Sequence, residues 1–308
     1  MRLLSVVVPV FNEAENLRLL HERLTAVGQA LSETTLEIVF VDDHSDDRTP
    51  EIIAELMARD PHVKAIRLSR NFGSHAAIRA GLDRCAGDAA CVLAADLQDP
   101  PELIPRLLEA LDAGADIVWA CPESREDCAV DVLFSRLYYR LLAMILPHSW
   151  KRGADVFAID RKALDAVNRI REKNTNFFAL VLWSGFRQAT ISYCAAARHA
   201  GVGKWRFSRK WKLFADSFAS FSTFPIRLIS LAGAGLLLAA VLLAGDAAKE
   251  PGGLTRIVVA LAGLQLLMLG IVAEYLWRAF DEGRSRPLYI VEETRGFSEV
   301  PPERHRNE

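Results

Sequence analysis

Carboxylate and amide side chains follow short apolar runs at several points of this chain. The stretch CVLAADLQDPP at 91–101 passes from small and apolar residues to Asp96, Gln98 and Asp99, and two prolines follow. Oxygen ligands of this hard type suit Mg²⁺ or Mn²⁺. A metal held there could bridge a donor diphosphate and neutralise it as it leaves. The stretch therefore indicates chemistry on a phosphate-bearing donor.

Two further clusters could meet the rest of such a donor. Asn12 and Glu13 follow VVVPVF, where helix N–H groups and a carboxylate could meet a ribose or a base, although helix capping explains them equally well. Asp42 and Asp43 end the run IVFVDD, and one of them could accept hydrogen bonds from a base or a ribose hydroxyl while the other caps the turn. The alternative for this pair is that both only form the turn.

The elements that must position these clusters alternate along residues 1–200. Short β-branched runs are separated by amphipathic stretches such as ENLRLLHERLTAVGQAL, which predicts βαβ units around a mostly parallel sheet. Ligands of such sheets bind at the carboxyl ends of the strands, which is where the polar clusters fall. The predicted strands are SVVVPV, LEIVFVDD, VKAIRLS, AACVLAAD and ADIVWA.

Composition argues against two other kinds of protein. The chain has 37 Lys and Arg against 39 Asp and Glu, a formal net charge of −2, so we expect no nucleic-acid partner that is bound through bulk positive charge. Its five cysteines form no C-x-x-C pair, so neither a disulfide framework nor a zinc site is indicated.

Two later runs contain no charged residue: Leu228 to Gly245 and Ile257 to Ala273. Each is close to the roughly 20 residues that a bilayer-spanning helix needs, which predicts two transmembrane helices within residues 225–278. A pair of buried core helices is the alternative. Basic residues lie before the first run and after the second, so the positive-inside rule puts both termini and the α/β domain in the cytoplasm.

The remaining segments complete the predicted organisation. Residues 1–203 form the α/β catalytic domain, 204–224 an amphipathic helix in the membrane interface, and 279–308 a cytoplasmic tail with one short β-like run, PLYIVEE. The interfacial helix is predicted from an aromatic stripe with basic neighbours, for which protein core is the alternative. The stripe consists of Phe207, Trp211, Phe214, Phe218 and Phe221.

Many motifs, in their order along the chain, resemble the family 2 glycosyltransferases that act on polyprenyl phosphates. This group includes bacterial undecaprenyl-phosphate glucosyltransferases, and dolichyl-phosphate mannose synthases are related to it. The resemblance runs from about residue 4 to the second apolar run. The motifs that carry it include VVVPVFNEAENL, VDDHSDDRT, RNFGSHAAIRAGLD, ADLQDPPELIP, SRLYYRLL, GADVFAIDRKALDAV and RHAGVGKW.

The resemblance implies a GT-A fold, which is Rossmann-like, and an inverting transfer of one sugar from a nucleotide-sugar donor such as UDP-glucose to undecaprenyl phosphate. It also implies a Mg²⁺ or Mn²⁺ cofactor and a multi-pass protein of the bacterial inner membrane. The lipid-phosphate sugar would then serve the modification of cell-surface glycan or lipopolysaccharide. Association into a homo-oligomer stays open.

Carried over residue by residue, the resemblance gives each matching position a role. Asp96 and Gln98 would hold the metal, and Asp155 in GADVF would lie near the sugar, where a direct catalytic role and a structural role both stay open. The nucleoside would be surrounded by Pro9, Phe11, Glu13 and Asp43, with Asp42 as the alternative to Asp43. Cations for the donor diphosphate or the acceptor phosphate would be Arg136, Arg198 and Lys204.

The chain departs from the family pattern in two places. The usual D-A-D-L-Q-D begins here with Ala94, so one carboxylate is missing and metal binding rests on Asp96 and Gln98, with Asp99 as a candidate helper. The segment CPESREDCAVD replaces a basic loop, with Arg125 as its candidate substitute. Two other functions therefore stay open: a membrane glycosyltransferase with a glycan acceptor, and a catalytically weakened protein that binds nucleotide sugar or partner subunits.

Overall fold

A computed structural model describes residues 2–123, 155–170, 172, 176–194, 233, 235, 253–284 and 286–297. The chain divides into two compact units. The first consists of Met1–Arg171, Asn176–Trp205 and Pro287–Glu308, and the second of Glu172–Thr175 and Arg206–Arg286. Each unit is described by itself.

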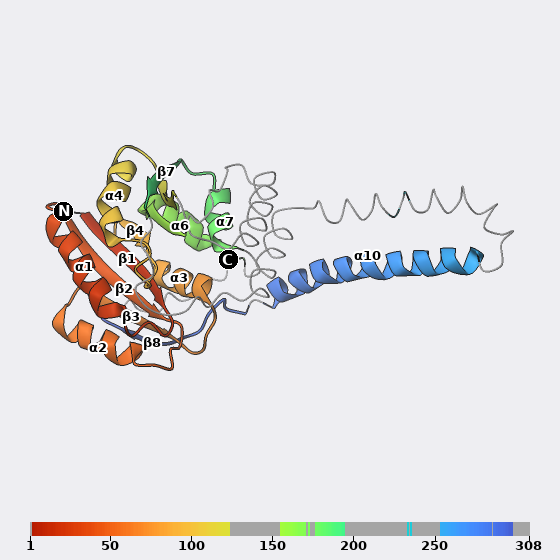
Figure 1. The fold of residues 1–308 in the computed structure, drawn as a ribbon, viewed down its shortest axis with the longest axis horizontal. Helices are drawn as coiled ribbons and strands as arrows, with labels where there is room; N and C mark the ends of the chain where they lie inside the picture. Colours follow the sequence, from red (N-terminus) through yellow and green to blue (C-terminus); the bar gives the residue numbers. More distant parts are fainter. Residues whose placement is uncertain are drawn as a thin grey trace, which may run out of the picture. The chain divides into compact units, whose positions relative to one another are not determined.

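The first unit is built on an eight-stranded sheet with the order β7-β5-β6-β4-β1-β2-β3-β8 (Figure 1). The pairs β1/β2, β1/β4, β2/β3 and β5/β7 are parallel, whereas β6 is antiparallel to β4 and β5, and β8 to β3. This confirms the predicted α/β fold with a mostly parallel sheet. The strands are β1 Arg2–Val10, β2 Thr34–Asp42, β3 Val63–Leu68, β4 Ala89–Val92, β5 Ile117–Pro122, β6 Val156–Asp160, β7 Gln188–Tyr193 and β8 Val291–Arg295.

Helices cover both faces of the sheet (Figure 1). Leu20 of α1, Ile53 of α2 and Leu107 of α4 share one buried core with Val6 and Phe40 of the sheet. Burying side chains of this size contributes roughly 1.5–3 kcal/mol each. The helices of this unit are α1 Leu17–Ala30, α2 Thr49–Arg59, α3 Ser74–Leu82, the 3-10 turn η1 Pro101–Leu103, α4 Ile104–Asp112, α6 Arg161–Arg169 and α7 Phe177–Trp183.

Helix α3 packs on the opposite face, very close to the strands. A Cβ added at Gly81 would lie 2.3 Å from Cγ1 of Val7 and 3.0 Å from Cγ2 of Val41. The absence of a side chain at Gly81 therefore sets how closely α3, and the loop that precedes it, approach β1 and β2.

Strand β8 confirms the β-like run predicted at PLYIVEE, but it shows that this part of the predicted tail belongs to the sheet of the domain. It pairs antiparallel with β3, with Ile66 opposite Thr294. The residues before it are also attached to the domain, because the Tyr289 hydroxyl donates to Asp83 Oδ2 at 2.6 Å and the Ser69 amide donates to the Ile290 carbonyl at 2.9 Å. The C-terminal segment thus completes one edge of the sheet.

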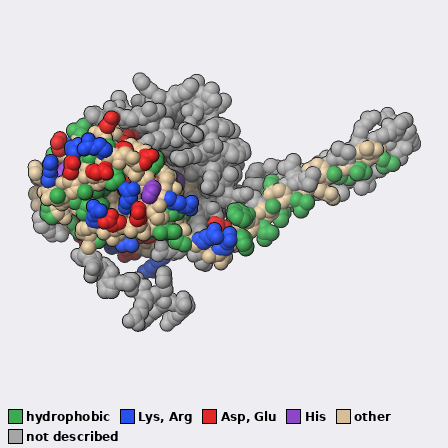
Figure 2. Space-filling view, turned by 90° about the horizontal axis from the view of Figure 1, so that it is seen from below, with side chains coloured by type: hydrophobic (Ala, Val, Ile, Leu, Met, Phe, Trp, Pro, Cys, Tyr) green, Lys and Arg blue, Asp and Glu red, His purple; other side chains and the backbone are tan. Residues whose placement is uncertain are grey.

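Helix α10, Gly253–Gly283, belongs to the second unit and contains the predicted run at 257–273. By length and composition it could cross a membrane over Leu261–Asp281. Figure 2 shows hydrophobic side chains along it and basic side chains near one end, where the Arg284 guanidinium lies 5.0 Å from the Phe280 ring centroid. Its exposed large apolar side chains include Leu254, Val258, Leu269, Val272, Leu276 and Trp277.

The other predicted membrane segments fall largely outside the described residues. The run at 228–245 is described only at Gly233 and Gly235, both of which are helical, and the segment 204–224 is not described. Among the residues that the structure describes, one helix is a candidate span, and the two-helix hairpin and the interfacial helix stay predictions.

A buried carboxylate joins β1, β2 and β3 at the opposite end of the strands from the polar clusters. Glu37 on β2 is 3% exposed and accepts hydrogen bonds from Lys64, from the Ser5 hydroxyl and, at 3.0 Å, from the Ala86 amide. Burial alone would raise the pKa of Glu37, but these hydrogen bonds and the Lys64 charge outweigh it, so the pKa lies below the ordinary value of 4.5.

We expect Glu37→Gln to lower the free energy of unfolding by about 1–3 kcal/mol at neutral pH, because the buried donors lose a charged acceptor. A depressed carboxyl pKa contributes stability above the unfolded-state pKa, which is lost as the pH falls through the folded-state value. The gap in melting temperature between wild type and variant should therefore shrink in acid. Glu55→Gln is the control, since Glu55 pairs with Arg18 at the surface. A gap that is the same at every pH would contradict this account.

Candidate active site

The loops that follow β1 and β2 are hydrogen-bonded to each other. The Asn12 side chain donates to Asp46 Oδ1 at 2.5 Å and accepts from the Asp46 amide at 3.0 Å. The Asn12 amide also donates to Ser45 Oγ at 2.9 Å, and the Glu13 amide to Thr49 Oγ1 at 3.0 Å. These bonds hold two of the polar clusters from the sequence analysis together. They lie at the edge of the sheet where the parallel strands end, which we call the carboxyl edge.

Asp42 and Asp43 are both 3% exposed, and their carboxylates accept hydrogen bonds from different segments. Asp42 accepts from the Ser45 amide at 2.8 Å and from Arg67 at 2.7 Å. The two carboxylate oxygens of Asp43 accept from the amides of Phe72 at 2.7 Å and Gly73 at 2.8 Å. Asp43 therefore fixes the loop that leads into α3, while Asp42 fixes the turn after β2.

The turn after β4 holds the candidate metal ligands. Asp96 Oδ1 accepts from the Gln98 amide at 3.2 Å, and both side chains are partly exposed. Asp99, in contrast, is 2% exposed and its carboxylate accepts from the Tyr193 hydroxyl of β7. The turn thus presents Asp96 and Gln98 and is anchored by Asp99, which differs from the helper role expected for Asp99.

Left-handed backbone occurs at one non-glycine residue after each of β1, β2 and β4. These are Asn12 with φ 55°, His44 with φ 63° and Leu97 with φ 60°. Asparagine and histidine adopt this conformation more often than most residues, but for Leu97 it costs energy that the surroundings must offset. Such strain is typical of functional edges, and all three positions lie at the edge where the sequence predicted a ligand.

The other predicted residues are placed as follows. Asp155 directly precedes β6, whose first residues pair with the ends of β4 and β5, so Asp155 lies at the same edge as the turn at 94–99. Pro9 pairs with Val41 inside the sheet, Phe11 follows β1, and the Glu13 carboxylate accepts from the Asn16 side chain at 2.7 Å. Arg125, Arg136, Arg198 and Lys204 lie outside the described residues.

His75 lies in the first turn of α3, after the loop that Asp43 holds. Its ring meets Phe178 edge-on, with the centroids 5.1 Å apart. Burial lowers the pKa of His75 to about 4, so the ring is neutral at physiological pH. His75 therefore adds no positive charge to this edge.

Asp96 and Gln98 fit a Mg²⁺ or Mn²⁺ ion by the chemistry of their donors. Among the described residues, no group of three or more His, Cys, Asp or Glu side chains could hold a metal. Mg²⁺ does not need such a cage, because it often binds through one or two carboxylates and completes its shell with water and substrate phosphate oxygens. The pair suits a metal that arrives with a diphosphate.

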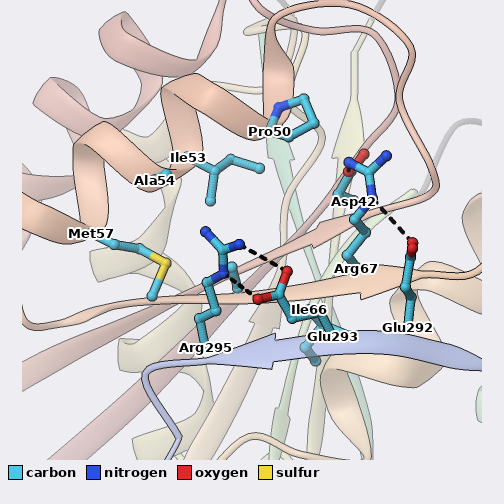
Figure 3. A pocket seen from close by; sticks show the side chains of 11 residues that line it. Asp42, Pro50, Ile53, Ala54, Met57, Ile66, Arg67, Glu292, Glu293 and Arg295 are labelled. Carbon is cyan, nitrogen blue, oxygen red and sulfur yellow. Dashed lines mark hydrogen bonds and ion pairs between the residues drawn. The ribbon is translucent and has the colours of Figure 1, made fainter.

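A cavity of about 250 Å³ opens beside this edge, between α2 and strands β3 and β8 (Figure 3). Ile53, Ala54 and Met57 form its apolar wall, and Arg67 and Glu292 lie on its charged side. Sequence reasoning did not select Arg67 or Glu292, because neither belongs to a motif. Arg67 and Glu292 are far apart in the chain and meet through a hydrogen bond between their side chains.

Tyr193→Phe tests whether β7 anchors the turn after β4. Removal of the hydroxyl should lower the free energy of unfolding by about 1–3 kcal/mol, because the buried Asp99 carboxylate loses a donor. The melting temperature of the full-length protein in detergent measures this. Tyr289→Phe is the matched control and should cost less, because Asp83, which accepts from Tyr289, is more exposed than Asp99. A Tyr193→Phe protein that melts with the wild type would contradict the anchor.

Comparison with known proteins gives matches over nearly the whole chain. Residues 5–167 match the family described as glycosyl transferase family 2. The chain is 37% identical over 308 residues to the uncharacterized glycosyltransferase YkcC of Bacillus subtilis, covering 95% of this chain and 94% of the relative. It is 33% identical over 313 residues to the uncharacterized glycosyltransferase sll0501 of Synechocystis, covering 98% of each. It is also 33% identical over 303 residues to the bactoprenol glucosyl transferase of Shigella phage SfV, covering 94% of this chain and 97% of the relative. The chain therefore belongs to glycosyltransferase family 2.

Proposed function

We propose that this protein transfers a single sugar from a nucleotide-sugar donor, UDP-glucose or a close relative of it, to polyprenyl phosphate, specifically undecaprenyl phosphate. The observation that carries the proposal is the similarity to a bactoprenol glucosyl transferase, which extends over 94% of this chain. The product would be a lipid-phosphate sugar that donates its sugar to cell-surface glycan or lipopolysaccharide.

The reaction needs little acid–base chemistry. A phosphate oxygen of the acceptor attacks the anomeric carbon, the bond from that carbon to the donor diphosphate breaks, and the nucleoside diphosphate leaves, so a single displacement inverts the configuration. Because the acceptor phosphate is already anionic at neutral pH, no general base has to deprotonate it. The protein must supply position and charge stabilisation.

We assign the described edge to the donor. Asp96 and Gln98 would hold Mg²⁺ or Mn²⁺, which would stabilise the negative charge of the leaving diphosphate. Asp155, at the same edge, would lie near the sugar, and Pro9, Phe11, Glu13 and Asp43, or Asp42 in its place, would surround the nucleoside. Arg136, Arg198 and Lys204 are proposed as cations for the donor diphosphate or the acceptor phosphate.

A lipid acceptor requires the protein to sit at a membrane. We propose that α10 is one span of a two-helix hairpin, that the segment 204–224 lies in the interface, and that the catalytic domain and both termini face the cytoplasm of a bacterial inner membrane. Support comes from the exposed apolar side chains of α10 and from the basic residues that flank the two runs in the sequence.

One observation favours a second candidate. Ala94 removes a carboxylate that the family usually keeps, which would suit a protein that binds nucleotide sugar with weakened catalysis. A glycan acceptor is the other enzymatic alternative. The same experiment separates all three.

The test is to incubate membranes that contain the full-length protein with undecaprenyl phosphate, Mg²⁺ and a panel of radiolabelled nucleotide sugars. We expect label from one donor to enter the lipid fraction, EDTA to abolish the transfer, and added Mg²⁺ or Mn²⁺ to restore it. Label that enters glycan instead would support the glycan acceptor, and donor binding without any transfer would support the weakened protein.

Asp96→Asn should reduce transfer at least roughly 100-fold, because loss of a metal-bound carboxylate removes several kcal/mol of charge stabilisation. The variant should fold, since Asp96 is partly exposed. Asp112→Asn is the control, because Asp112 pairs with Arg2 at the surface. Wild-type turnover by Asp96→Asn would refute the metal assignment.

A further inference from the structure

Arg67 on β3 joins three elements of the sheet. Its Nη1 donates to Asp42 Oδ2 on β2 at 2.7 Å, and its Nη2 donates to the Ser45 carbonyl at 3.3 Å. Its Nε donates to Glu292 Oε2 on β8 at 3.2 Å. Figure 3 shows Arg67 with Asp42 on one side and Glu292 on the other. One guanidinium therefore contacts both the turn after β2 and the C-terminal strand.

The turn after β2 depends on this guanidinium. The Asp42 carboxylate is buried, and a buried carboxylate without a cation or several hydrogen bonds is strongly destabilising. Arginine suits the position because its planar group can donate in several fixed directions, which a lysine ammonium on a flexible stem does not reproduce. His44, two residues after Asp42 in the same turn, has left-handed backbone.

Glu292, on strand β8, contacts Arg67 and the turn after β2. Its carboxylate lies 3.2 Å from Arg67 Nε and 3.6 Å from His44 Nδ1, so it contacts both the cation that holds the turn and a residue of the turn. Strand β8 pairs with β3 on both sides of a register shift, with Arg67 opposite Glu293 and Leu68 opposite Val291, and the Ser69–Ile290 hydrogen bond continues the contact. Glu292 is the extra residue at this β-bulge, a feature that can redirect a side chain, and its carboxylate meets Arg67 from there.

We infer that Glu292 is a positioning residue for the nucleoside side of the donor site. It orients Arg67, and Arg67 fixes the turn from Asp42 to Ser45. The inference rests on the proposed function, because it takes that turn as part of the donor site. Strand β8, which follows helix α10 in the sequence, would therefore contribute to donor binding.

The test compares Glu292→Gln with wild type, as full-length protein in detergent. UDP is titrated in the presence of Mg²⁺ by calorimetry, and hydrogen exchange is followed at the Ser45 amide, which donates to Asp42 Oδ1 at 2.8 Å. We expect the Kd for UDP to rise roughly 2- to 5-fold, as for loss of one half-exposed ion pair. The KM for the sugar donor should rise by a similar factor while kcat is unchanged, and Ser45 should exchange faster.

Two further variants sharpen the result. Glu293→Gln makes the same charge change at the next position of β8, opposite Arg67. The Glu293 carboxylate pairs with Arg295 of its own strand at 2.6 and 2.9 Å, and Arg67 acts on it through charge, so this variant should change UDP affinity and Ser45 exchange less than Glu292→Gln. Arg67→Lys keeps the positive charge but loses the directed fork, and should weaken UDP binding roughly 10-fold.

The inference would be overturned if the Glu292→Gln and Glu293→Gln proteins had the same UDP affinity and the same rate of Ser45 amide exchange. So would a loss of kcat at unchanged donor KM, since positioning of the nucleoside should act on donor affinity. If wild-type protein binds no nucleoside diphosphate, the proposed function fails, and Ser45 exchange alone then decides whether Glu292 orders the turn.

Discussion

The carboxyl edge of the sheet depends on buried carboxylates, above all on Asp43. A carboxylate that is removed from water must be paired or hydrogen-bonded, and Asp43 meets this need by accepting the amides of Phe72 and Gly73. In doing so it ties the end of β2 to the loop that opens α3. Asp42 and Asp99 do the same for the turns after β2 and β4, through Arg67 and Tyr193. The loops of the edge are thus shaped by acids that are themselves buried.

This arrangement separates two kinds of acidic residue that look alike in the sequence. Asp99 and Asp96 stand three positions apart in one motif, yet Asp99 is buried against Tyr193 while Asp96 stays partly exposed in the turn. Buried acids can hold the left-handed backbone at His44 and Leu97, and an exposed acid can bind a metal that also contacts a diphosphate. Ala94 carries no carboxylate, whereas the anchoring residue of the motif, Asp99, is in place.

The sequence was sufficient for strands β1 to β5 and their common edge, because β-branched runs and strand-end polar clusters are local patterns. Strands β6 and β7 were not among the predicted strands. Strand β8 was assigned to a tail because most of its side chains are exposed and its partner, β3, lies far away in the chain. Arg67, Tyr193 and Glu292 were missed for the same reason: each acts through a contact that no local motif records. The anchoring role of Asp99 depends on burial, which its residue type does not reveal.

In the reaction that we propose, one sugar is joined directly to a polyprenyl phosphate. The most direct measurement is the intact mass of the lipid product formed from undecaprenyl phosphate and the accepted donor in membranes that contain this protein. We expect a lipid heavier by one sugar residue that retains a single phosphate. A lipid that carries a second phosphate or several sugars, or an unchanged lipid beside an extended glycan, would contradict it.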